Sequence, residues 1–359
     1  MKIIAILASG TGGHIYPALS VANEYISRGY KILWIGTPNG LEDKIVNDPD
    51  IAMEKIDSQG LRGKSIFKKM ISLLYLFKSV IQSAIIFKKY KPIMVFGFGG
   101  YVSVSSSFSA FLLSIPIFAH EQNAIAGTAN KINYFFAKRI YETFPLSFNK
   151  NNKKIMHTGN PVRTSFNALT KPDIKYNDNK SSINILVMGG SQGSKFLNKT
   201  MPFALSHFHE KNISIKHITG SNDHDLVINK YAEYKLEADV ITYSNDIGLL
   251  YDWAGLVVCR AGSTSISEIA TIGRASLLVP FPFATDDHQL LNANYLAKNS
   301  AAILMTESDD FVENFVSIIN ILLNNPKKIY SLAKNIQGIF PEKTIDVIVN
   351  DSLRLIKQI

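Results

Sequence analysis

Short apolar runs recur along the chain, and several of them end in a glycine-rich or polar cluster that precedes a helix-like stretch. The first run, residues 2–8, breaks into Ser9-Gly10-Thr11-Gly12-Gly13-His14, and a helical pattern follows from Pro17 to Arg28. This order predicts a buried strand that leads through a loop to the N-terminus of a helix. Glycines let the backbone approach a ligand, and unpaired N–H groups at a helix start favour a phosphate or an oxyanion.

The same order recurs about 180 residues later. A β-rich run at residues 183–188 breaks into Gly189-Gly190-Ser191-Gln192-Gly193-Ser194-Lys195, and a helix is predicted from Phe196. Two units of strand, glycine-rich loop and helix predict two α/β domains of similar construction that face one ligand between them.

The remaining pattern alternates strands and helices, which indicates parallel sheets. Further strands are expected at 31–35, 92–96, 115–119, 213–219, 240–243, 256–259 and 276–279. Helices are expected near 41–47, within 64–91, from residue 127 and at 341–359, and the polar segment 170–182 is expected to be a surface loop or linker. Parallel sheets bind ligands beyond the carboxyl ends of their strands, where the glycine-rich and polar clusters fall.

Neither glycine-rich loop is a complete nucleotide-binding fingerprint. Residues 10–15 match G-x-G-x-x-G/A except at the last position, and no acidic residue ends the strand at residues 33–37 to bind a ribose. A loop of the type G-x-x-x-x-G-K-[ST] is also absent from the sequence, since no hydroxyl residue follows Lys195. Hydride transfer with a dinucleotide is therefore disfavoured.

Composition narrows the class of protein. A length of 359 residues with 46% hydrophobic and 19% charged residues fits about two folded domains. The single cysteine, Cys259, excludes a disulfide framework and a multi-cysteine zinc site, and it favours a reducing compartment. We expect no signal peptide, because the first apolar run is short, and no run reaches the roughly 20 residues of a membrane span.

Basic and apolar residues are concentrated between Asp57 and Glu121, where the sequence has no acidic residue, although the net charge of the whole chain is +9. The cations are Arg62, Lys64, Lys68, Lys69, Lys78, Lys88, Lys89 and Lys91. Their interleaving with apolar residues fits a patch on an anionic membrane face, and it fits equally a pair of core helices with solvated lysines. Nucleic acid is disfavoured because stacking aromatics and polar base readers are not mixed with the cations.

Two strand ends in the second half carry further candidate chemistry. The strand at 256–259 leads into Arg260-Ala261-Gly262 and a hydroxyl-rich helix start, where N–H groups can hold a diphosphate and Glu268 can accept hydrogen bonds from a ribose diol. The alternative is that the hydroxyls only cap the helix, with Glu268 and Ser265 forming a capping box. The next strand end brings Asp286, Asp287, His288 and Gln289 to the same crevice, which favours ligand binding.

His14 is a candidate general base, because histidine titrates near neutrality and this one follows the first glycine-rich loop. The alternative is a structural histidine. The acid-x-acid pattern of Asp223-His224-Asp225 is expected to be a solvated loop rather than a metal site. No metal is required if helix ends and Arg163 neutralise a leaving diphosphate.

Taken together, these segments resemble the MurG family, a branch of glycosyltransferase family 28. The matching stretches follow the family's order over nearly the whole chain. They are Gly10-Thr11-Gly12-Gly13-His14 with Pro17, Phe98-Gly99-Gly100-Tyr101-Val102-Ser103, His120-Glu121-Gln122-Asn123 with Ala126-Gly127 and Asn130-Lys131, Gly159-Asn160-Pro161-Val162-Arg163, Gly189-Gly190-Ser191-Gln192-Gly193, and the segments from Arg260 to Glu268 and from Asp287 to Gln289.

The resemblance implies an α/β protein with the GT-B fold, in which two Rossmann-like domains with doubly wound parallel sheets face a central cleft. Residues 1–160 would bind acceptor and membrane, with the helix at 341–359 packing back on them, and residues 161–340 would bind UDP-N-acetylglucosamine. The implied activity is that of an inverting hexosyltransferase of peptidoglycan synthesis, hence of cell-wall biogenesis, cell shape and cell division. It would move N-acetylglucosamine to the C4 hydroxyl of undecaprenyl-pyrophosphoryl-N-acetylmuramyl-pentapeptide (lipid I) to form lipid II.

The resemblance also implies roles for individual residues. Thr11, Gly12 and Gly13 would lie at the diphosphate and acceptor side. His14 is the first candidate for the base and Glu121 the second, and no cofactor is implied. The family's main-chain contact to uracil falls near Ser244, where this chain departs from the family's more apolar run. The expected donor contacts are Asn123, Arg163, Ser191, Gln192, Ser244, Ser263, Thr264, Ser265, Ile266, Ser267, Glu268 on the ribose and Gln289 on the sugar hydroxyls.

The resemblance places the protein peripherally at the cytoplasmic face of the bacterial inner membrane. It favours membrane contact for residues 64–91, and it allows other cell-wall and division proteins as partners. Two other function classes stay open. A glycosyltransferase acting on another membrane lipid, such as a diacylglycerol, would share the donor loops, although the stretch His120-Glu121-Gln122-Asn123 argues against it. A non-catalytic nucleotide-sugar-binding protein would bind the donor without turnover.

Overall fold

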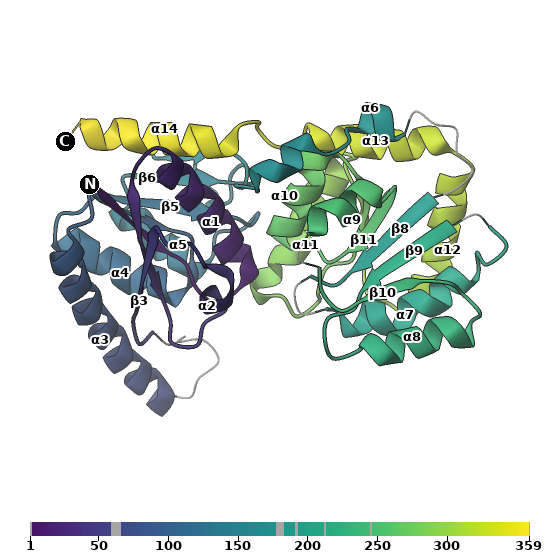
Figure 1. Ribbon diagram of the computed structural model, residues 1–359, viewed down its shortest axis with the longest axis horizontal. Coiled ribbons are helices and arrows are strands. Elements are labelled where there is room, and N and C mark those ends of the chain that lie inside the picture. The colour runs from purple at the N-terminus through teal and green to yellow at the C-terminus, as the bar shows by residue number, and fades with distance from the viewer. Residues whose placement is uncertain are drawn as a thin grey trace. The chain divides into compact units, whose positions relative to one another are not determined.

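The computed structural model describes residues 2–58, 66–176, 183–190, 193–211, 213–244 and 246–358, and for residues 66–73 it describes the backbone alone. The chain forms two compact units, each with its own sheet (Figure 1). Unit 1 comprises Met1–Arg163 and Pro341–Ile359, and unit 2 comprises Thr164–Phe340. Several residues singled out by the sequence lie outside the described part, namely Arg62, Lys64, Ser191, Gln192 and the side chains of Lys68 and Lys69.

Unit 1 contains a seven-stranded sheet in the order β3-β2-β1-β4-β5-β6-β7, and every pairing in it is parallel. The order reverses between β1 and β4, so that a crevice is expected beyond the carboxyl ends of these two strands. The strands are β1 (Ile3–Leu7), β2 (Lys31–Gly36), β3 (Ile51–Lys55), β4 (Met94–Gly97), β5 (Ile117–Glu121), β6 (Arg139–Glu142) and β7 (Ile155–His157).

Helices cover both faces of the unit 1 sheet, because buried side chains alternate along β1. Ile4 and Ile6 join a cluster with residues of α1 and α14, whereas Ala5 and Leu7 join a cluster with residues of α3 and α4. The helices of this unit are α1 (Gly12–Ser27), α2 (Glu42–Ile45), α3 (Ile66–Tyr90), α4 (Gly100–Leu112), α5 (Thr128–Phe136) and α14 (Thr344–Lys357).

The C-terminal helix α14 packs on α1 although more than three hundred residues separate them (Figure 1). Tyr25 and Ser352 form a buried hydrogen bond of 2.6 Å between their hydroxyl oxygens. Asp351 accepts hydrogen bonds from Arg139 Nε at 2.9 Å and from the Tyr141 hydroxyl at 3.1 Å. The last helix is therefore an integral layer of the unit that begins the chain.

Unit 2 contains a six-stranded parallel sheet in the order β10-β9-β8-β11-β12-β13, which reverses between β8 and β11. Its strands are β8 (Ile183–Met188), β9 (Ile213–Ile218), β10 (Asp239–Ile241), β11 (Leu256–Cys259), β12 (Ala275–Leu278) and β13 (Ile303–Leu304). Its helices are η1 (Thr164–Ala168), α6 (Pro172–Lys175), α7 (Lys195–Ser206), α8 (His224–Glu233), α9 (Ile247–Trp253), α10 (Ser263–Ile272), η2 (Thr285–Asp287), α11 (His288–Lys298), α12 (Phe311–Leu323) and α13 (Pro326–Gln337).

Two doubly wound parallel sheets confirm the predicted α/β class, and three local expectations were wrong. One continuous helix, α3, replaces the expected pair of helices, and residues 224–225 begin α8 instead of lying in a loop. Helix α1 begins at Gly12 rather than Pro17, so that Pro17 lies inside it. Proline is common at the first helical position, which is why the helix was expected to begin at Pro17.

Candidate functional site

The loop after β1 brings backbone N–H groups and His14 to the switch point of the unit 1 sheet. Gly10 has φ +91°, a left-handed conformation that favours glycine, and Thr11 is the extended N-cap of α1. The Thr11 carbonyl accepts hydrogen bonds from the backbone N–H of His14 and of Ile15. His14 therefore lies in the first turn of α1, where the helix dipole favours an anion.

Three loops at the carboxyl ends of β1, β4 and β5 meet at the His14 ring. His14 Nδ1 lies 3.2 Å from Gln122 Oε1, and Gln122 is only 1% exposed. Gly99, which precedes α4, has φ +104°, and a Cβ atom there would lie 2.8 Å from His14 Cε1. The backbone of Gly99 therefore covers the ring more closely than any side chain would permit. The sequence pointed to His14 but not to the two residues that hold it.

Glu121 is committed to holding the loop that follows β5. It is 2% exposed, its Oε1 accepts from the Asn123 N–H at 2.9 Å, and its Oε2 accepts from the Gly127 N–H at 3.0 Å and from Asn130 Nδ2 at 2.9 Å. Asn123 Nδ2 also lies 3.4 Å from Oε1. These contacts organise residues 121–130 around one carboxylate, an arrangement that favours a supporting role for Glu121 over that of a base.

His120 is an uncharged structural histidine beneath this loop. It is fully buried, its ring lies 5.8 Å from that of Phe98, and its Nε2 donates to the Gly159 carbonyl at 3.0 Å. Burial lowers the pKa of His120 to about 4. The ring thus ties β5 to the segment that ends at Arg163 without carrying charge near neutral pH.

The buried carboxylate of Glu42, which was not predicted from the sequence, supports the first glycine-rich loop. Glu42 is fully buried, and it accepts hydrogen bonds from the backbone N–H of Thr37 at 2.6 Å and of Gly10 at 3.4 Å. A Cβ atom at Gly36 would lie 2.8 Å from Glu42 Oε1 and one at Gly40 2.3 Å from it. An acidic side chain therefore does lie at the end of β2, but it binds backbone there.

Arg163 lies near the N-terminal turn of α1. Its guanidinium carbon is 5.4 Å from the centre of the Tyr16 ring, within the range of a cation–π contact. A Cβ atom at Gly12 would lie 3.1 Å from the same ring. Helix N-terminus and guanidinium thus form a positive region around Thr11, Gly12 and Gly13, all of which are at least partly exposed. Such a region suits a phosphate.

The second glycine-rich loop approaches neighbouring backbone closely. A Cβ atom at Gly193 would lie 2.0 Å from the Thr219 carbonyl oxygen, and one at Gly189 would lie 2.2 Å from the Ser194 nitrogen. Ser194 then caps α7, its hydroxyl accepting from the Leu197 N–H at 3.3 Å. Gly193 therefore packs tightly against the residues that follow β9. The switch point of this sheet lies on the other side of β8, between β8 and β11.

The hydroxyl-rich segment after β11 forms the start of helix α10. The alternative of a capping box between Ser265 and Glu268 was wrong. The N-cap of α10 is Gly262, and Glu268 accepts instead from the Tyr251 hydroxyl at 3.1 Å. Burial, followed by the neighbouring Glu268 carboxylate, raises the pKa of Tyr251 well above its usual value, so that its hydroxyl stays protonated and donates. The Thr264 hydroxyl oxygen is buried and makes no hydrogen bond within the described part of the chain.

The other members of this segment differ in exposure. Ser263 and Ser267 are buried, and the Ser267 hydroxyl donates to the Ser263 carbonyl at 2.8 Å. Ile266 is fully buried in the core, whereas Ser265 is partly exposed. A ligand at this helix start would therefore contact Ser263 and Ile266 mainly through their backbone groups.

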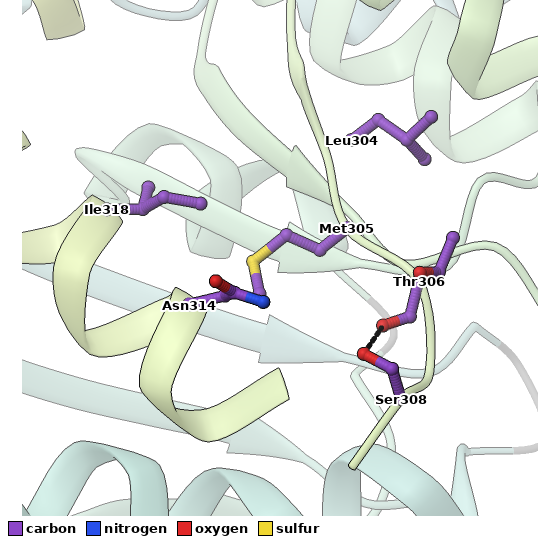
Figure 2. Close-up of a pocket in the computed structure, with 6 residues that line it drawn as sticks. All are labelled: Leu304, Met305, Thr306, Ser308, Asn314 and Ile318. Carbon is purple, nitrogen blue, oxygen red and sulfur yellow. Dashed lines mark hydrogen bonds between the residues drawn. The ribbon is translucent and has the colours of Figure 1, made fainter. Parts of the chain in front are cut away.

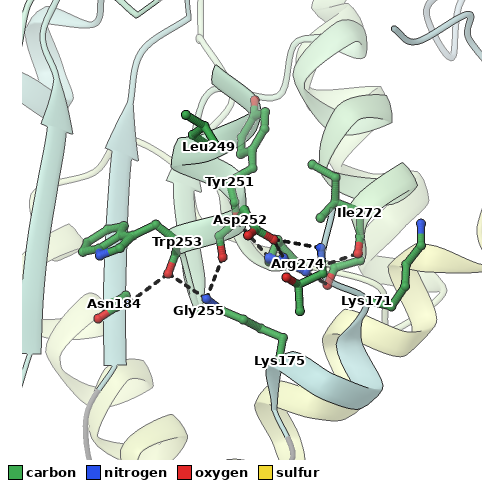
Figure 3. Close-up of polar contacts among 12 residues, drawn as sticks. Lys171, Lys175, Asn184, Leu249, Tyr251, Asp252, Trp253, Gly255, Ile272 and Arg274 are labelled. Atoms are coloured by element: carbon green, nitrogen blue, oxygen red, sulfur yellow. Dashed lines mark hydrogen bonds and ion pairs between the residues drawn. The ribbon is translucent and has the colours of Figure 1, made fainter. Parts of the chain in front are cut away.

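Arg274 supports Tyr251 from the opposite side, a role that no local pattern in the sequence predicts. Figure 3 shows this fully buried guanidinium joining α9 to the start of β12. Arg274 Nε donates to the Tyr251 carbonyl at 2.8 Å, and Nη2 lies 2.9 Å from Asp252 Oδ1, which also accepts from the Thr170 N–H. The helix that carries Tyr251 is therefore held at its C-terminal end by an ion pair between the buried Arg274 guanidinium and the partly exposed Asp252 carboxylate.

The segment after β12 is more open than the sequence suggested. Asp286 and Asp287 are exposed and have φ of 54° and 52°. Gln289, in the first turn of α11, accepts from the Phe281 N–H at 3.0 Å, and this contact shapes the loop. Ser244 lies partly exposed after β10, at the carboxyl edge shared with the loops above. Among the described residues, no group of His, Cys, Asp and Glu side chains could hold a metal ion.

A small pocket in unit 2 contains none of these residues. Figure 2 shows it near the end of β13 and the start of α12, lined by Leu304, Met305, Thr306, Ser308, Asn314 and Ile318. Its volume of about 210 Å³ is below that of common small-molecule sites, about 300–1,000 Å³. The pocket therefore adds nothing to the candidate site.

Unit 1 exposes apolar side chains on three helices, α3, α4 and α5, of which α4 packs against the other two. We call this set the apolar face; its exposed members are Leu74, Phe77, Ile81, Ile85, Phe108, Phe111, Leu112, Ile132 and Phe135. The spacing of the α3 members is that of one helical face, while Ser79, Ser83, Ile86 and Phe87 are buried. The core-helix alternative therefore fails for this face.

Small residues allow α3 and α4 to lie close together, since the Ser83 and Ser106 hydroxyl oxygens are 2.9 Å apart. Lys78 and Lys89 form ion pairs with Asp57 and Glu54 rather than standing alone. Lys88 is exposed beside the apolar face. Within the described residues, no helix is sufficiently long and apolar to cross a bilayer.

Comparison with known proteins identifies relatives over the whole chain. Residues 4–142 match the glycosyltransferase family 28 N-terminal domain, and residues 184–347 match the C-terminal domain of that family. The chain is 38% identical over 348 residues to the UDP-N-acetylglucosamine–N-acetylmuramyl-(pentapeptide) pyrophosphoryl-undecaprenol N-acetylglucosamine transferase of Pseudomonas syringae pv. syringae (strain B728a), covering 97% of each chain. It is 36% identical to the protein of the same name from Pseudomonas putida (strain W619), covering 99% of this chain and 98% of that one.

Solved structures agree with this relationship. The crystal structure of MurG from Acinetobacter baumannii matches with a TM-score of 0.85 and 32% identity over 100% of both chains. A UDP-GlcNAc 2-epimerase from Neisseria meningitidis, solved with UDP-GlcNAc, matches with a TM-score of 0.68 at 12% identity, which speaks for a common fold alone.

Proposed function

The chain belongs to glycosyltransferase family 28, and we infer that it transfers N-acetylglucosamine from UDP-N-acetylglucosamine to lipid I, which forms lipid II. The observation that carries this function is the 38% identity to a transferase of that name over 97% of both chains. The relationship covers both units, so that donor and acceptor halves are retained together. Enzymes of this kind act in peptidoglycan synthesis.

The reaction sets three chemical requirements. The C4 hydroxyl of the muramyl sugar loses its proton and attacks the anomeric carbon from the face opposite UDP, and the bond from that carbon to the diphosphate oxygen breaks. The enzyme therefore needs a base, a means of stabilising oxocarbenium character and positive groups for the departing diphosphate. Attack from the opposite face inverts the anomeric centre and gives a β-1,4 bond.

We propose that unit 2 binds the donor. Glu268, held by Tyr251, would accept hydrogen bonds from the ribose hydroxyls, and the N-terminus of α10 from Ser263 to Ser267 would face the diphosphate. The buried Thr264 hydroxyl, which makes no hydrogen bond among the described residues, supports a ligand here. Gln289 would contact the sugar hydroxyls and Ser244 the uracil, and Ser191 and Gln192 remain expected donor contacts by position in the family motif.

We propose that unit 1 binds the acceptor and supplies the base. The loop from Thr11 to Gly13 and the nearby Arg163 would bind phosphate, and His14 would take the C4 proton. The hydrogen bonds on Glu121 support a role in shaping the loop that carries Asn123, so we rank Glu121 behind His14 as base. Helix ends and guanidinium groups supply positive charge for the diphosphates.

We propose that the apolar face meets the cytoplasmic face of the inner membrane. Its side chains are well exposed, with Phe77 at 67% and Phe135 at 74%, and Lys88 lies beside them. Apolar side chains can dip into the headgroup boundary while a cation contacts anionic lipid. Such docking would bring unit 1 to a lipid-linked acceptor, and cell-wall and division proteins are conceivable partners there.

The direct test is a transfer assay with UDP-N-acetylglucosamine and a short-chain lipid I analogue. We expect a disaccharide product with a β linkage and release of UDP in equal amount. Transfer to a diacylglycerol with none to the lipid I analogue would instead identify a transferase for another membrane lipid. Tight UDP binding with neither transfer nor donor hydrolysis would identify a non-catalytic nucleotide-sugar-binding protein.

A further inference from the structure

The hydrogen bond between His14 and Gln122 has only one chemically reasonable direction. Gln122 Nε2 donates to the Phe98 carbonyl at 3.0 Å and to the His120 carbonyl at 3.3 Å. Carbonyl oxygens only accept, so the NH₂ end of the amide must face them. If the amide were flipped, Gln122 Oε1 would face these two carbonyl oxygens. That contact would be unfavourable, because the Gln122 residue is only 1% exposed and water cannot relieve it.

The orientation of the amide in turn determines the histidine tautomer. Gln122 Oε1 can only accept, so the His14 Nδ1 at 3.2 Å must carry the proton that is donated. A neutral imidazole has one protonated nitrogen, and its lone pair is then on Nε2. Gly99 restricts the ring further, because its backbone lies where a Cβ atom would be 3.0 Å from Nδ1.

We propose that Gln122 is a positioning residue that holds neutral His14 as the Nδ1–H tautomer. His14 Nε2 is then the atom that takes the proton from the acceptor hydroxyl: the O–H bond breaks, an Nε2–H bond forms, and the oxygen lone pair attacks the anomeric carbon. This role rests on the proposed function. The amide is neutral, so it fixes the tautomer without the rise in histidine pKa that a carboxylate would cause.

Nitrogen-15 NMR of the histidine-labelled protein tests the tautomer without any turnover. Protonated and lone-pair ring nitrogens have well-separated shifts, and the His14 signals are those lost in His14→Gln. We expect Nδ1 protonated and Nε2 unprotonated in the wild type above the histidine pKa. Nε2 protonated in the wild type would overturn the proposal and leave the proposed function intact, even if no transfer were measurable.

Two variants test the consequence for catalysis. Gln122→Met should mix the His14 tautomers and lower kcat by roughly 10-fold or more, with a ceiling near the 10⁴-fold cost of a wrong tautomer in a serine protease, while KM for the donor changes little. Gln122→Glu keeps an acceptor for Nδ1 but sets a second oxygen against the Phe98 and His120 carbonyls, so it should restore part of kcat only while its carboxyl is protonated and can donate to one of them.

The matched control is Gln82→Met, since Gln82 also holds backbone and side chain of one residue, Asp57, but lies on α3. This variant should leave kcat, the pH profile and the His14 signals unchanged. Loss of thermal stability in Gln122→Met, with unchanged kcat per folded molecule and unchanged His14 signals, would show a structural role only and overturn the proposal.

Discussion

Donor affinity should depend on the Glu268 carboxylate. Replacing Glu268 by alanine removes a charged acceptor and should weaken UDP binding by roughly 1.5–3 kcal/mol, the range for hydrogen bonds to charged groups. Calorimetric titration with UDP measures this directly. Glu313→Ala, at an exposed position of α12, is the control and should bind UDP normally. Equal affinities in the two folded variants would refute the assignment of Glu268.

Catalysis should depend on His14 while donor binding does not. His14→Ala should lower the transfer rate by roughly 10²- to 10⁴-fold, the usual contribution of a positioned general base. UDP affinity should stay near normal, because Glu268, Ser244 and the N-terminus of α10, which are proposed to bind UDP, belong to unit 2. Transfer rate, UDP affinity and melting temperature are measured on one sample. A rate near that of the wild type would exclude the base role.

At the residue scale, sequence reasoning finds groups that neighbour one another along the chain and misses those that fold together. His14 was a candidate because it follows a glycine-rich loop. Its partner Gln122 is 108 residues away, and the direction of their contact depends on the carbonyls of Phe98 and His120. Glu42 was missed for a related reason, since only folding brings its carboxylate to Gly10.

At the scale of elements, the apolar face should determine binding to lipid. The double variant Phe77→Ser and Phe111→Ser removes two exposed rings from α3 and α4. Burying a side chain of this size contributes about 1.5–3 kcal/mol, so each change should lower the partition onto anionic vesicles roughly 10-fold or more. Vesicle sedimentation measures the effect.

Two further variants separate apolar from electrostatic contact at that face. Lys88→Glu should weaken vesicle binding by about 1 kcal/mol for each unit of charge, and the loss should shrink at high salt. Phe203→Ser alters a ring of similar exposure on α7 of unit 2 and should change nothing. If all these proteins bind vesicles alike, the apolar face does not meet lipid.

The contacts of the buried Arg274 guanidinium at the end of α9 should be important for the stability of unit 2. Arg274→Met leaves the carbonyl of Tyr251 without its donor and Asp252 without its guanidinium. Leaving the buried Tyr251 carbonyl without its donor costs about 1–3 kcal/mol, and loss of the ion pair adds little because the Asp252 side chain is 33% exposed. Urea unfolding measures the loss, with Lys327→Met at an exposed position of α13 in the same unit as control. A midpoint equal to that of the control would contradict the expectation.

Strongly apolar elements were predictable, and weakly patterned ones were not. Strand β11 was placed correctly because four buried residues stand in an unbroken apolar run. Strand β3 was missed because it is short, only Ile51 of its five residues is buried, and its apolar and polar residues do not alternate. Helix α3 was expected as two helices because apolar residues cover more than one face of it, and only the structure shows which of them are exposed.

At the scale of the whole molecule, one buried histidine in each unit should make the fold sensitive to acid. Burial lowers the pKa of His120 to about 4 and that of His217 to about 3, against about 6.5 in an unfolded chain. The unfolded chain therefore takes up these protons first. Stability should be full above pH 6.5 and fall as the pH is lowered, by about 3 kcal/mol for His120 once the pH is below 4.

Calorimetric melting between pH 8 and pH 5 tests this sensitivity, because most carboxylates stay ionised over that window. The midpoint should be level down to about pH 6.5 and then fall. His207→Gln, which removes an exposed histidine, should not alter the slope, whereas His217→Gln should reduce it in whatever fraction folds. A midpoint that does not change from pH 8 to pH 5 would contradict the prediction.

The packing of α14 on unit 1 has a consequence for biosynthesis. Tyr25, Arg139 and Tyr141 find their partners on a helix that is translated only after the whole of unit 2. At a translation rate of about 5–20 residues per second, synthesis of unit 2 and α14 takes roughly 10–40 seconds, and α14 can pack on unit 1 only after that time. The unit translated first is thus the one completed last, and a nascent chain released early would carry a finished unit 2 beside an unfinished unit 1.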